Sequence, residues 1–277
     1  ELNASIKSGQ LSSYYADLLM IPTSAAAQFA AEGLLLDMRS LPFYTVKTEG
    51  NAGAGSYNGK NYFDLSAATE SPELVYALYF NRDMAESEGA KELYSVAADG
   101  ELTFDYILAF SERIALENGQ YSMTVGGKYD SHSYLGDIVA VRSGIDLVSG
   151  VSGGYPQVSY ASGELDAAQT LIDLLRDISI YMPPAEVAPA EGETAVASVK
   201  TGAELFAEGN SLFHMGTLSE MKDIYNKKTA WGILPLPTLS GDAYAVTVQE
   251  RAVLCVSANN SRPDVMGVLL PALDAAS

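Results

Sequence analysis

Cysteine is almost absent from this chain of 277 residues, and histidine is nearly as rare. Cys255 is the single cysteine, so the chain cannot form an internal disulfide or a cysteine-based metal cluster. It lies between Leu254 and Val256 in an apolar run, which favours a small buried side chain over a reactive thiol. His132 and His214 are the two histidines, and neither belongs to a His-x-x-x-His pair, so no zinc site is predicted.

Positive charge is also scarce. The chain has 16 lysines and arginines against 35 aspartates and glutamates, which gives a formal net charge of −19. Such a field repels nucleic-acid phosphates and anionic lipid headgroups. Apolar residues make up 48% of the chain and charged residues 18%, a composition typical of folded globular proteins. We therefore predict an acidic, folded protein with a neutral ligand and no nucleic-acid partner.

Long apolar runs are missing as well. The longest candidate, around residues 25–36, is interrupted by Gln28, Glu32 and Gly33, so no membrane-spanning helix is predicted. The chain has no initiator Met and no basic segment leading into an apolar one. We expect that a signal peptide was removed or left out, and cellular location has to be argued indirectly.

Alternating strand and helix signals predict an α/β protein. Residues 17–21 form an apolar run that leads through Pro22 into a predicted helix over 25–32, and Gly33 closes that helix. Further strand and helix signals follow in alternation. These are a strand over 74–80, a helix over 104–117 capped by Thr103, and an amphipathic helix over 164–182.

The stretch from 209 to 263 carries polar residues where strands end and helices begin, which is where open α/β sheets bind small ligands. Thr217 and Glu220 have the spacing of a capping box, as do Thr201 and Glu204. The turns at Thr23 and Thr217 are expected to offer free amides and hydroxyls to a ligand; simple N-capping is the alternative. A side chain at Gly216 is expected to project into the ligand's space.

One catalytic pattern occurs in the chain. Residues 150–154 read G-x-S-x-G, and Ser152 is followed by Asp173 or Asp177 and then His214 in hydrolase order. A nucleophile elbow requires a helix directly after the serine, whereas Pro156 and a stretch without helical period follow here. The glycine-rich residues 53–61 complete no phosphate-binding motif. We therefore predict no enzyme activity and no cofactor, with a serine hydrolase as the alternative.

Five short segments, in order along nearly the whole chain, resemble one known family. They are Tyr15–Leu18 with Phe29–Asp37, Tyr57–Lys60, Leu78–Asp83, Thr103–Asp105 and Gly232–Pro237. They are similar to segments of the extracellular solute-binding proteins, family 1, of carbohydrate-uptake ABC transporters, the group that includes maltose-binding protein.

The resemblance implies a periplasmic-binding-protein type II fold, with two lobes, a hinge and a ligand cleft. It places residues 1–80 and 252–277 in lobe 1 and residues 81–251 in lobe 2. It also implies that Glu1 and Ser277 are trimmed ends, because members of the family carry further elements on both sides.

By the same resemblance, the ligand contacts come from three turns of the family's fold. Those positions hold Thr23, Ser24, Asp64, Ser66, Thr69, Glu70, His214, Gly216 and Thr217. Many members have a stacking Trp soon after Gly216, whereas this chain has Leu218. Either Tyr134 or Tyr155 replaces it or the ligand is not a pyranose. Asp130, His132 and Tyr134 belong to a polar cluster that either lines the cleft or forms an ordinary solvated loop.

The function implied is a non-enzymatic binding subunit of an ABC importer, which holds a sugar and delivers it to the permease. Its location would be extracytoplasmic, as a surface lipoprotein or in a periplasm. Besides the hydrolase, a surface binding module without a transport role stays open.

Overall fold

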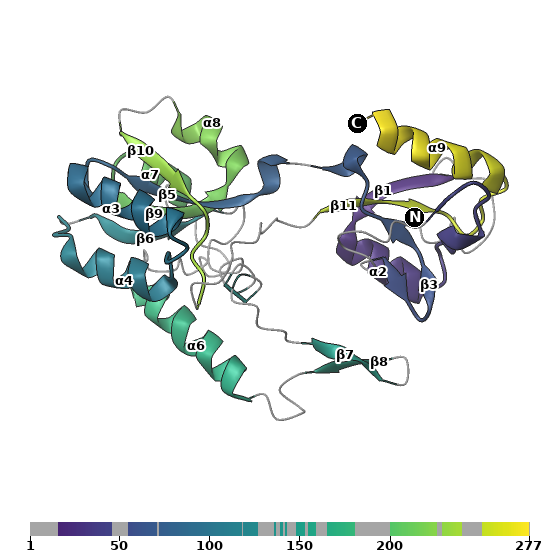
Figure 1. Cartoon of the computed structure of the whole chain (residues 1–277), viewed down its shortest axis with the longest axis horizontal. Coiled ribbons are helices and arrows are strands. Elements are labelled where there is room, and N and C mark those ends of the chain that lie inside the picture. Colours follow the sequence, from purple (N-terminus) through teal and green to yellow (C-terminus); the bar gives the residue numbers. More distant parts are fainter. Residues whose placement is uncertain are drawn as a thin grey trace, which may run out of the picture. The chain divides into compact units, whose positions relative to one another are not determined.

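The computed structural model divides the chain into two compact units, formed by residues 1–72 with 250–277 and by residues 73–249 (Figure 1). The first boundary between the units, after residue 72, lies before the strand at 76–81, whereas the predicted boundary lies at Asn81, at the end of that strand. The second boundary, before residue 250, lies close to the predicted crossing at Ala252. The structure describes residues 16–45, 55–70, 72–117, 119–126, 136, 139–140, 142, 148–152, 155–158, 165–180, 200–225, 229–239 and 251–276.

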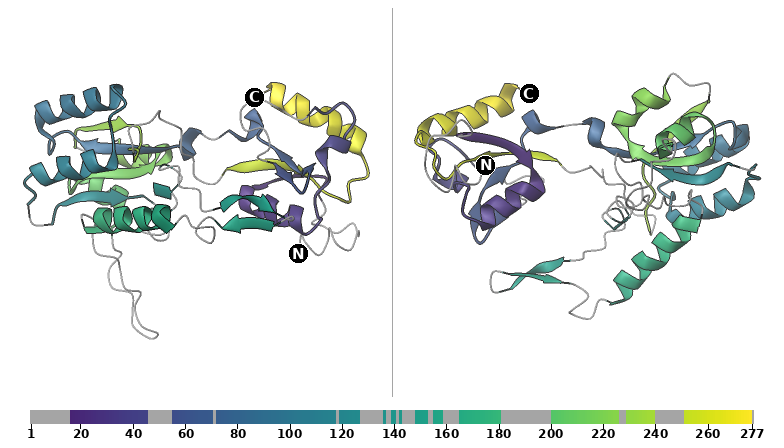
Figure 2. Two further views of the ribbon diagram at one scale, coloured as in Figure 1. Left: turned by 60° about the horizontal axis from the view of Figure 1, so that its bottom comes forward. Right: turned by 180° about the vertical axis from the view of Figure 1, so that it is seen from behind.

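The first unit is built on an antiparallel sheet of order β1-β11-β4. Its strands are β1 (Leu18–Pro22), β11 (Ala252–Val256) and β4 (Phe63–Asp64). Helix α2 (Thr23–Ala31) packs on the face that carries Leu19 and Cys255, and α9 (Pro263–Ala276) packs on the face that carries Leu254 and Val256. Figure 2 shows these two helices on opposite sides of the strands.

Cys255 is buried within this sheet, as predicted. Burial raises the pKa of its thiol to about 12, so the sulfur stays protonated at neutral pH.

A short hairpin and several 3-10 turns complete the described part of the first unit. Asn58 and Gly59 both adopt positive φ angles, the backbone that a tight hairpin turn requires, and they join β2 to β3. The elements are β2 (Ser56–Tyr57), β3 (Lys60–Asn61), η1 (Met38–Ser40) and η2 (Ala67–Thr69), with η3 (Pro72–Leu74) at the division between the units.

The second unit contains a four-stranded sheet of order β10-β5-β9-β6. Its strands are β5 (Tyr76–Asn81), β6 (Tyr121–Val125), β9 (Ser211–Thr217) and β10 (Trp231–Leu234). Strand β9 pairs with β5 antiparallel and with β6 parallel. All residues of β5 and β9 are buried, so helices must cover both faces of this sheet.

Two helical layers supply that cover. Leu78 and Phe80 of β5 face a core shared with Leu93 and Phe110 on one side. Tyr79 and Ala77 face a smaller cluster on the other side. The first layer contains α3 (Glu86–Ala98), α4 (Phe104–Arg113) and α6 (Leu165–Ile180), and the second contains α7 (Gly202–Ala207), η5 (Leu218–Glu220) and α8 (Met221–Ile224).

Several local expectations are confirmed. Thr103 caps α4, because its hydroxyl accepts a hydrogen bond from the amide of Tyr106 at 3.1 Å. The capping box of Thr201 and Glu204 is present at α7. Other element ends differ by a few residues from the predicted ones. None of the helices that the structure describes has the length and apolar character needed to cross a bilayer.

Asp37 is expected to stabilise the first unit in a pH-dependent manner. Its carboxylate accepts two hydrogen bonds from the guanidinium of Arg39, at 3.0 and 2.7 Å, and one from the amide of Asn61 at 3.1 Å. The Arg39 hydrogen bonds, against the effect of burial, lower the pKa of Asp37 from 3.8 to about 2. The stabilisation is therefore complete above the unfolded-state pKa and is lost as the pH falls towards about 2.

We predict that Asp37→Asn lowers the free energy of unfolding by roughly 0.2–1 kcal/mol at pH 7, the range of solvent-exposed ion pairs. The difference from the wild type should shrink between pH 5 and pH 3, as measured by urea unfolding. A difference that grows as the pH falls would contradict the prediction.

Candidate functional site

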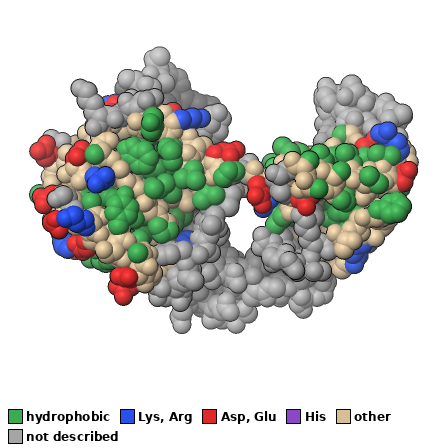
Figure 3. All heavy atoms as spheres, turned by 45° about the horizontal axis from the view of Figure 1, so that its top comes forward, with side chains coloured by type: hydrophobic (Ala, Val, Ile, Leu, Met, Phe, Trp, Pro, Cys, Tyr) green, Lys and Arg blue, Asp and Glu red, His purple; other side chains and the backbone are tan. Residues whose placement is uncertain are grey.

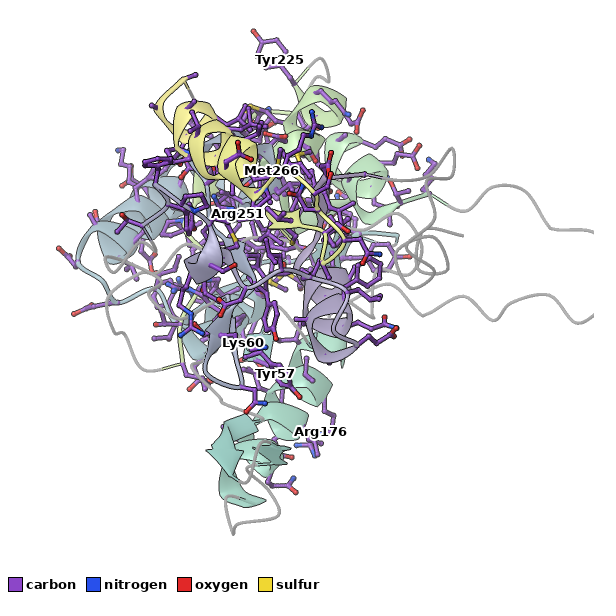
Figure 4. The ribbon with its side chains drawn as sticks, turned by 90° about the vertical axis from the view of Figure 1, so that its right-hand side faces the viewer. Tyr57, Lys60, Arg176, Tyr225, Arg251 and Met266 are labelled. Carbon is purple, nitrogen blue, oxygen red and sulfur yellow. The ribbon has the colours of Figure 1, made fainter. Side chains whose placement is uncertain are left out.

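Four of the six predicted ligand residues of the first unit gather around Arg251, which immediately precedes β11 (labelled in Figure 4). Its carbonyl oxygen accepts hydrogen bonds from the amide of Thr23 at 3.0 Å and from the Thr23 hydroxyl at 2.8 Å. The expectation that Thr23 offers a free amide and hydroxyl is therefore wrong. The backbone of the neighbouring segment takes both groups, and Pro22 is the N-cap residue of α2.

The Arg251 side chain connects this turn to η2. Its Nη2 donates to the carbonyl of Ser66 at 2.8 Å and lies 3.9 Å from a carboxylate oxygen of Glu70. The amide and hydroxyl of Thr69 donate to the same Ser66 carbonyl. Thr23, Ser66, Thr69 and Glu70 thus form one connected cluster, in which Ser66 and Thr69 are buried and Glu70 is exposed.

Sequence reasoning missed Arg251, although two signals pointed to it. It is one of only 16 basic residues in an acidic chain, and it stands next to the predicted crossing at Ala252. Its Nε is buried and has no hydrogen-bond partner among the residues that the structure describes. A buried donor in this state is costly.

A cavity of about 150 Å³ lies beside this cluster within the first unit. Most of its lining is apolar and comes from η1, β11 and α9. Ser66 and Asp274 supply polar groups, and they are hydrogen-bonded to each other at 3.1 Å. Of the predicted ligand residues that the structure describes, Ser66 is the one that lines it.

The structure describes the remaining predicted ligand residues of the first unit and the central loop only in part. Ser24 is exposed near the start of α2. Asp64 pairs with Leu254 through the backbone of β4, and its side chain lies outside the described structure. Tyr155 begins β8 (Tyr155–Val158), described for its backbone only. The last three predicted positions, Asp130, His132 and Tyr134, lie outside the described residues.

In the second unit the predicted residues belong to a buried polar network centred on His214. The His214 side chain is 0% exposed. Its Nδ1 lies 2.9 Å from the hydroxyl of Thr124 on β6, and its Nε2 lies 2.8 Å from a carboxylate oxygen of Glu220 in η5. The face of the molecule shown in Figure 3 accordingly displays no histidine among the described residues.

Aromatic rings enclose the imidazole. Phe206 of α7 is stacked on His214 with ring centroids 5.7 Å apart, and Tyr79 of β5 lies at 5.9 Å. The Tyr79 hydroxyl donates to the carbonyl of Thr217 at 2.9 Å. Burial, together with the nearby carboxylate of Glu220, raises the pKa of Tyr79, so this hydroxyl remains a donor at neutral pH.

Glu220 is the polar residue of this unit that sequence reasoning recognised only as a cap. Burial opposes its ionisation, but the hydrogen bond and charge of His214 and the amide of Thr217 hold the pKa of Glu220 below its usual range. The carboxylate is therefore ionised at neutral pH and can only accept hydrogen bonds. His214 must then carry its proton on Nε2, whereas Nδ1 can either accept from Thr124 or donate to it.

Two glycines make room for this carboxylate. A Cβ atom at Gly126 would lie 2.2 Å from one carboxylate oxygen of Glu220. A Cβ at Gly216 would lie 2.6 Å from Nε2 of His214 and 2.8 Å from the other Glu220 oxygen. A side chain at Gly216 would therefore enter the His214–Glu220 pair, and the expectation that it would also enter the ligand's space stays a prediction.

Thr217 is also buried, so its amide and hydroxyl are not free. The amide donates to Glu220 at 3.1 Å, which is the reach-back bond of the predicted capping box. The hydroxyl lies 2.7 Å from the Ser219 hydroxyl. His214, Gly216 and Thr217 thus come together as predicted from their place at a strand end, but they contact each other and Glu220 in this structure.

The strand–turn–helix context of a nucleophile elbow is not found at Ser152. Ser152 ends β7 (Val148–Ser152) and pairs with Tyr155 at the start of β8, so a hairpin strand follows it instead of a helix. Among the described residues, no group of three or more His, Cys, Asp or Glu side chains is arranged to hold a metal ion.

This architecture was compared with known protein families, curated proteins and solved structures. No family model and no curated protein matches the chain. A cyclo/maltodextrin-binding protein solved in complex with maltotetraose aligns with 100% of the chain at a TM-score of 0.56 and 16% identity. A family 1 extracellular solute-binding protein from Bifidobacterium longum subsp. infantis aligns with 98% of the chain at a TM-score of 0.61 and 14% identity.

The chain has the periplasmic-binding-protein type II fold. This agrees with the resemblance recognised in its sequence segments. The chain spans 63% and 66% of the length of these two binding proteins. At identities of 14–16% the likeness carries the fold alone.

We predict that Gly126→Ala destabilises the second unit by roughly 1–3 kcal/mol, as measured by urea unfolding. The new Cβ forces the Glu220 carboxylate away, and the buried Nε2 of His214 then loses its partner.

The control is a double-mutant cycle with Glu220→Ala. In that background the carboxylate is already absent, so Gly126→Ala should cost much less than in the wild type. Equal costs in both backgrounds would show that Gly126 is needed for a reason other than Glu220.

Proposed function

We propose that this chain is a non-enzymatic solute-binding protein that holds a carbohydrate in the interlobe cleft implied by its sequence resemblance. The observation that carries the proposal is the fold likeness, which extends over 98–100% of the chain to two binding proteins. One of these was solved with maltotetraose bound, and the other is named as an extracellular solute-binding protein. The segment resemblance to carbohydrate-uptake proteins supports the same assignment independently of the fold.

The charge of the chain supports a neutral ligand. With a net charge of −19, the protein repels phosphorylated and other strongly anionic solutes over a Debye length of about 8 Å or more. Hydroxyl-rich sugars carry no charge and are recognised by short hydrogen bonds, which this field does not oppose.

The proposal includes the partner and the location. A binding protein of this kind delivers its sugar to the permease subunits of an ABC importer. It works outside the cytoplasm, either as a lipoprotein on the cell surface or in a periplasm. The extracellular naming of one structural neighbour supports this location. No cofactor enters the proposed function.

A thermal-shift screen over neutral mono- and oligosaccharides, with maltotetraose among them, tests the proposal. A sugar that binds only the folded state at 100 times its Kd adds about 2.7 kcal/mol of stability. For a chain of this size the melting temperature should rise by roughly 5–10 °C. Sorbitol at the same concentration is the control for solvent effects. Absence of a shift with every sugar would overturn the proposal.

We also predict that the best-binding oligosaccharide is recovered chemically unchanged after prolonged incubation, because a hairpin strand follows Ser152 where an elbow needs a helix. Ser152→Ala should bind that sugar with unchanged affinity. Chromatography of the incubated sugar makes the measurement. Multiple-turnover cleavage that disappears in Ser152→Ala would instead establish the hydrolase alternative.

A further inference from the structure

The Glu220 carboxylate has the properties of a ligand-binding group, beyond its role as a cap. Its side chain is 17% exposed, whereas the His214 ring to which it is bonded is fully enclosed. The carboxylate therefore lies at the boundary between the buried network and solvent. It sits at the edge of the sheet where the parallel strands β6 and β9 both end, beside Gly126 and Gly216.

The hydrogen bonds that described residues donate to the Glu220 carboxylate do not use all of its acceptor positions. A carboxylate offers about four acceptor positions. Oε2 accepts from Nε2 of His214, and Oε1 accepts from the amide of Thr217. The Thr217 hydroxyl also donates to Oε1 at 3.4 Å, and the Ser219 hydroxyl, 2.7 Å away, can donate to Thr217 in turn. The described residues therefore use three of the four acceptor positions, and a ligand donor can take the fourth.

The site is also held in place more firmly than a cap requires. The second capping-box glutamate, Glu204, bonds the amide of Thr201 at 2.7 Å from an exposed position. Glu220 makes the same kind of bond to the amide of Thr217. In addition, its carboxylate is bonded to the buried His214, and two glycines leave space for its oxygens. Burying a carboxylate beside a histidine, with no lysine or arginine of the described residues bonded to it, is a poor route to stability. Such an arrangement does fix the direction of the acceptor before a ligand arrives.

We propose that Glu220 is a ligand-contacting residue of the second unit, that its carboxylate accepts hydrogen bonds from sugar hydroxyls, and that His214 is its positioning residue. This inference rests on the proposed carbohydrate-binding function and deepens it. An ionised acceptor cannot bond another carboxylate, because neither group carries a proton to donate. A uronate whose carboxylate faces Glu220 is therefore repelled, and neutral sugars are the ligand class that this acceptor fits in every orientation.

Titration calorimetry tests the assignment with two sets of probes. The neutral set contains glucose, galactose, mannose, xylose and their oligosaccharides, including maltotetraose, and the anionic set contains glucuronate and galacturonate. The wild type should bind at least one neutral sugar, and roughly tenfold or more tighter than either uronate. The tightest neutral sugar then serves as the probe for the variants.

Glu220→Gln keeps the shape of the side chain and removes its charge, and its amide can still bond His214. It should bind the chosen neutral sugar at least roughly tenfold more weakly and lose most of the discrimination against uronates. Glu204→Gln is the matched control, because it makes the same chemical change in the other capping box, and its affinities should equal those of the wild type. Glu220→Asp retains the charge and should preserve the discrimination at reduced affinity.

The outcomes separate the two proposals. Binding of no sugar from either set would overturn the carbohydrate-binding function and this inference with it. Normal binding and discrimination by a folded Glu220→Gln would overturn the role of Glu220 alone. A wild type that prefers uronates, or an equal loss of affinity in Glu204→Gln, would also overturn it. Circular dichroism of each variant establishes that the fold is retained.

Discussion

The second unit depends on the complete burial of strand β9. All seven residues of this strand are buried, so each of its backbone polar groups needs a partner from a neighbouring strand. Strand β5 supplies these partners on one edge and β6 on the other. The same burial obliges helices to cover both faces, which accounts for the two layers around α4 and α7. The arrangement of the unit follows from this one requirement.

Burial also decides what the polar side chains of β9 can do. Ser211, His214 and Thr217 cannot reach bulk water, and each finds partners within the protein. The histidine is satisfied on both ring nitrogens because Thr124 lies on the adjacent strand and Glu220 follows the strand end. A network of this kind can hold an acceptor in one orientation, and preorganisation of that sort reduces the entropic cost of ligand binding.

In the first unit, several of the predicted ligand residues are held by bonds to one arginine instead of by a buried strand. Three of this unit's predicted ligand residues, Ser66, Thr69 and Glu70, are joined through the carbonyl of Ser66 and the side chain of Arg251. Arg251 also connects the start of β11 to the β1–α2 turn through its own backbone. The cluster therefore links segments that are more than 180 residues apart in sequence. A linkage of this kind orders the turns of the unit without a disulfide or metal.

Local sequence signals determined much of this protein. The helix caps at Thr103 and Thr201, the burial of Cys255 and the hairpin at Gly59 all follow from a few neighbouring residues, because capping, turn geometry and apolar runs act over short distances. Segment order along the chain was enough to indicate the type II binding-protein fold. The position of Gly216 at a strand end could also be predicted from the sequence.

Tertiary structure alone decided the chemistry of the strand ends. That Thr23 bonds the backbone of Arg251, and that Gly126 makes room for Glu220, depends on residues brought together from 228 and about a hundred positions apart. The local sequence around His214 fits an exposed ligand-binding residue and a buried residue equally well. It became buried because Thr124, Phe206 and Glu220 converge on it from different elements. Such long-range pairing depends on the packing of the whole sheet, which no local pattern encodes.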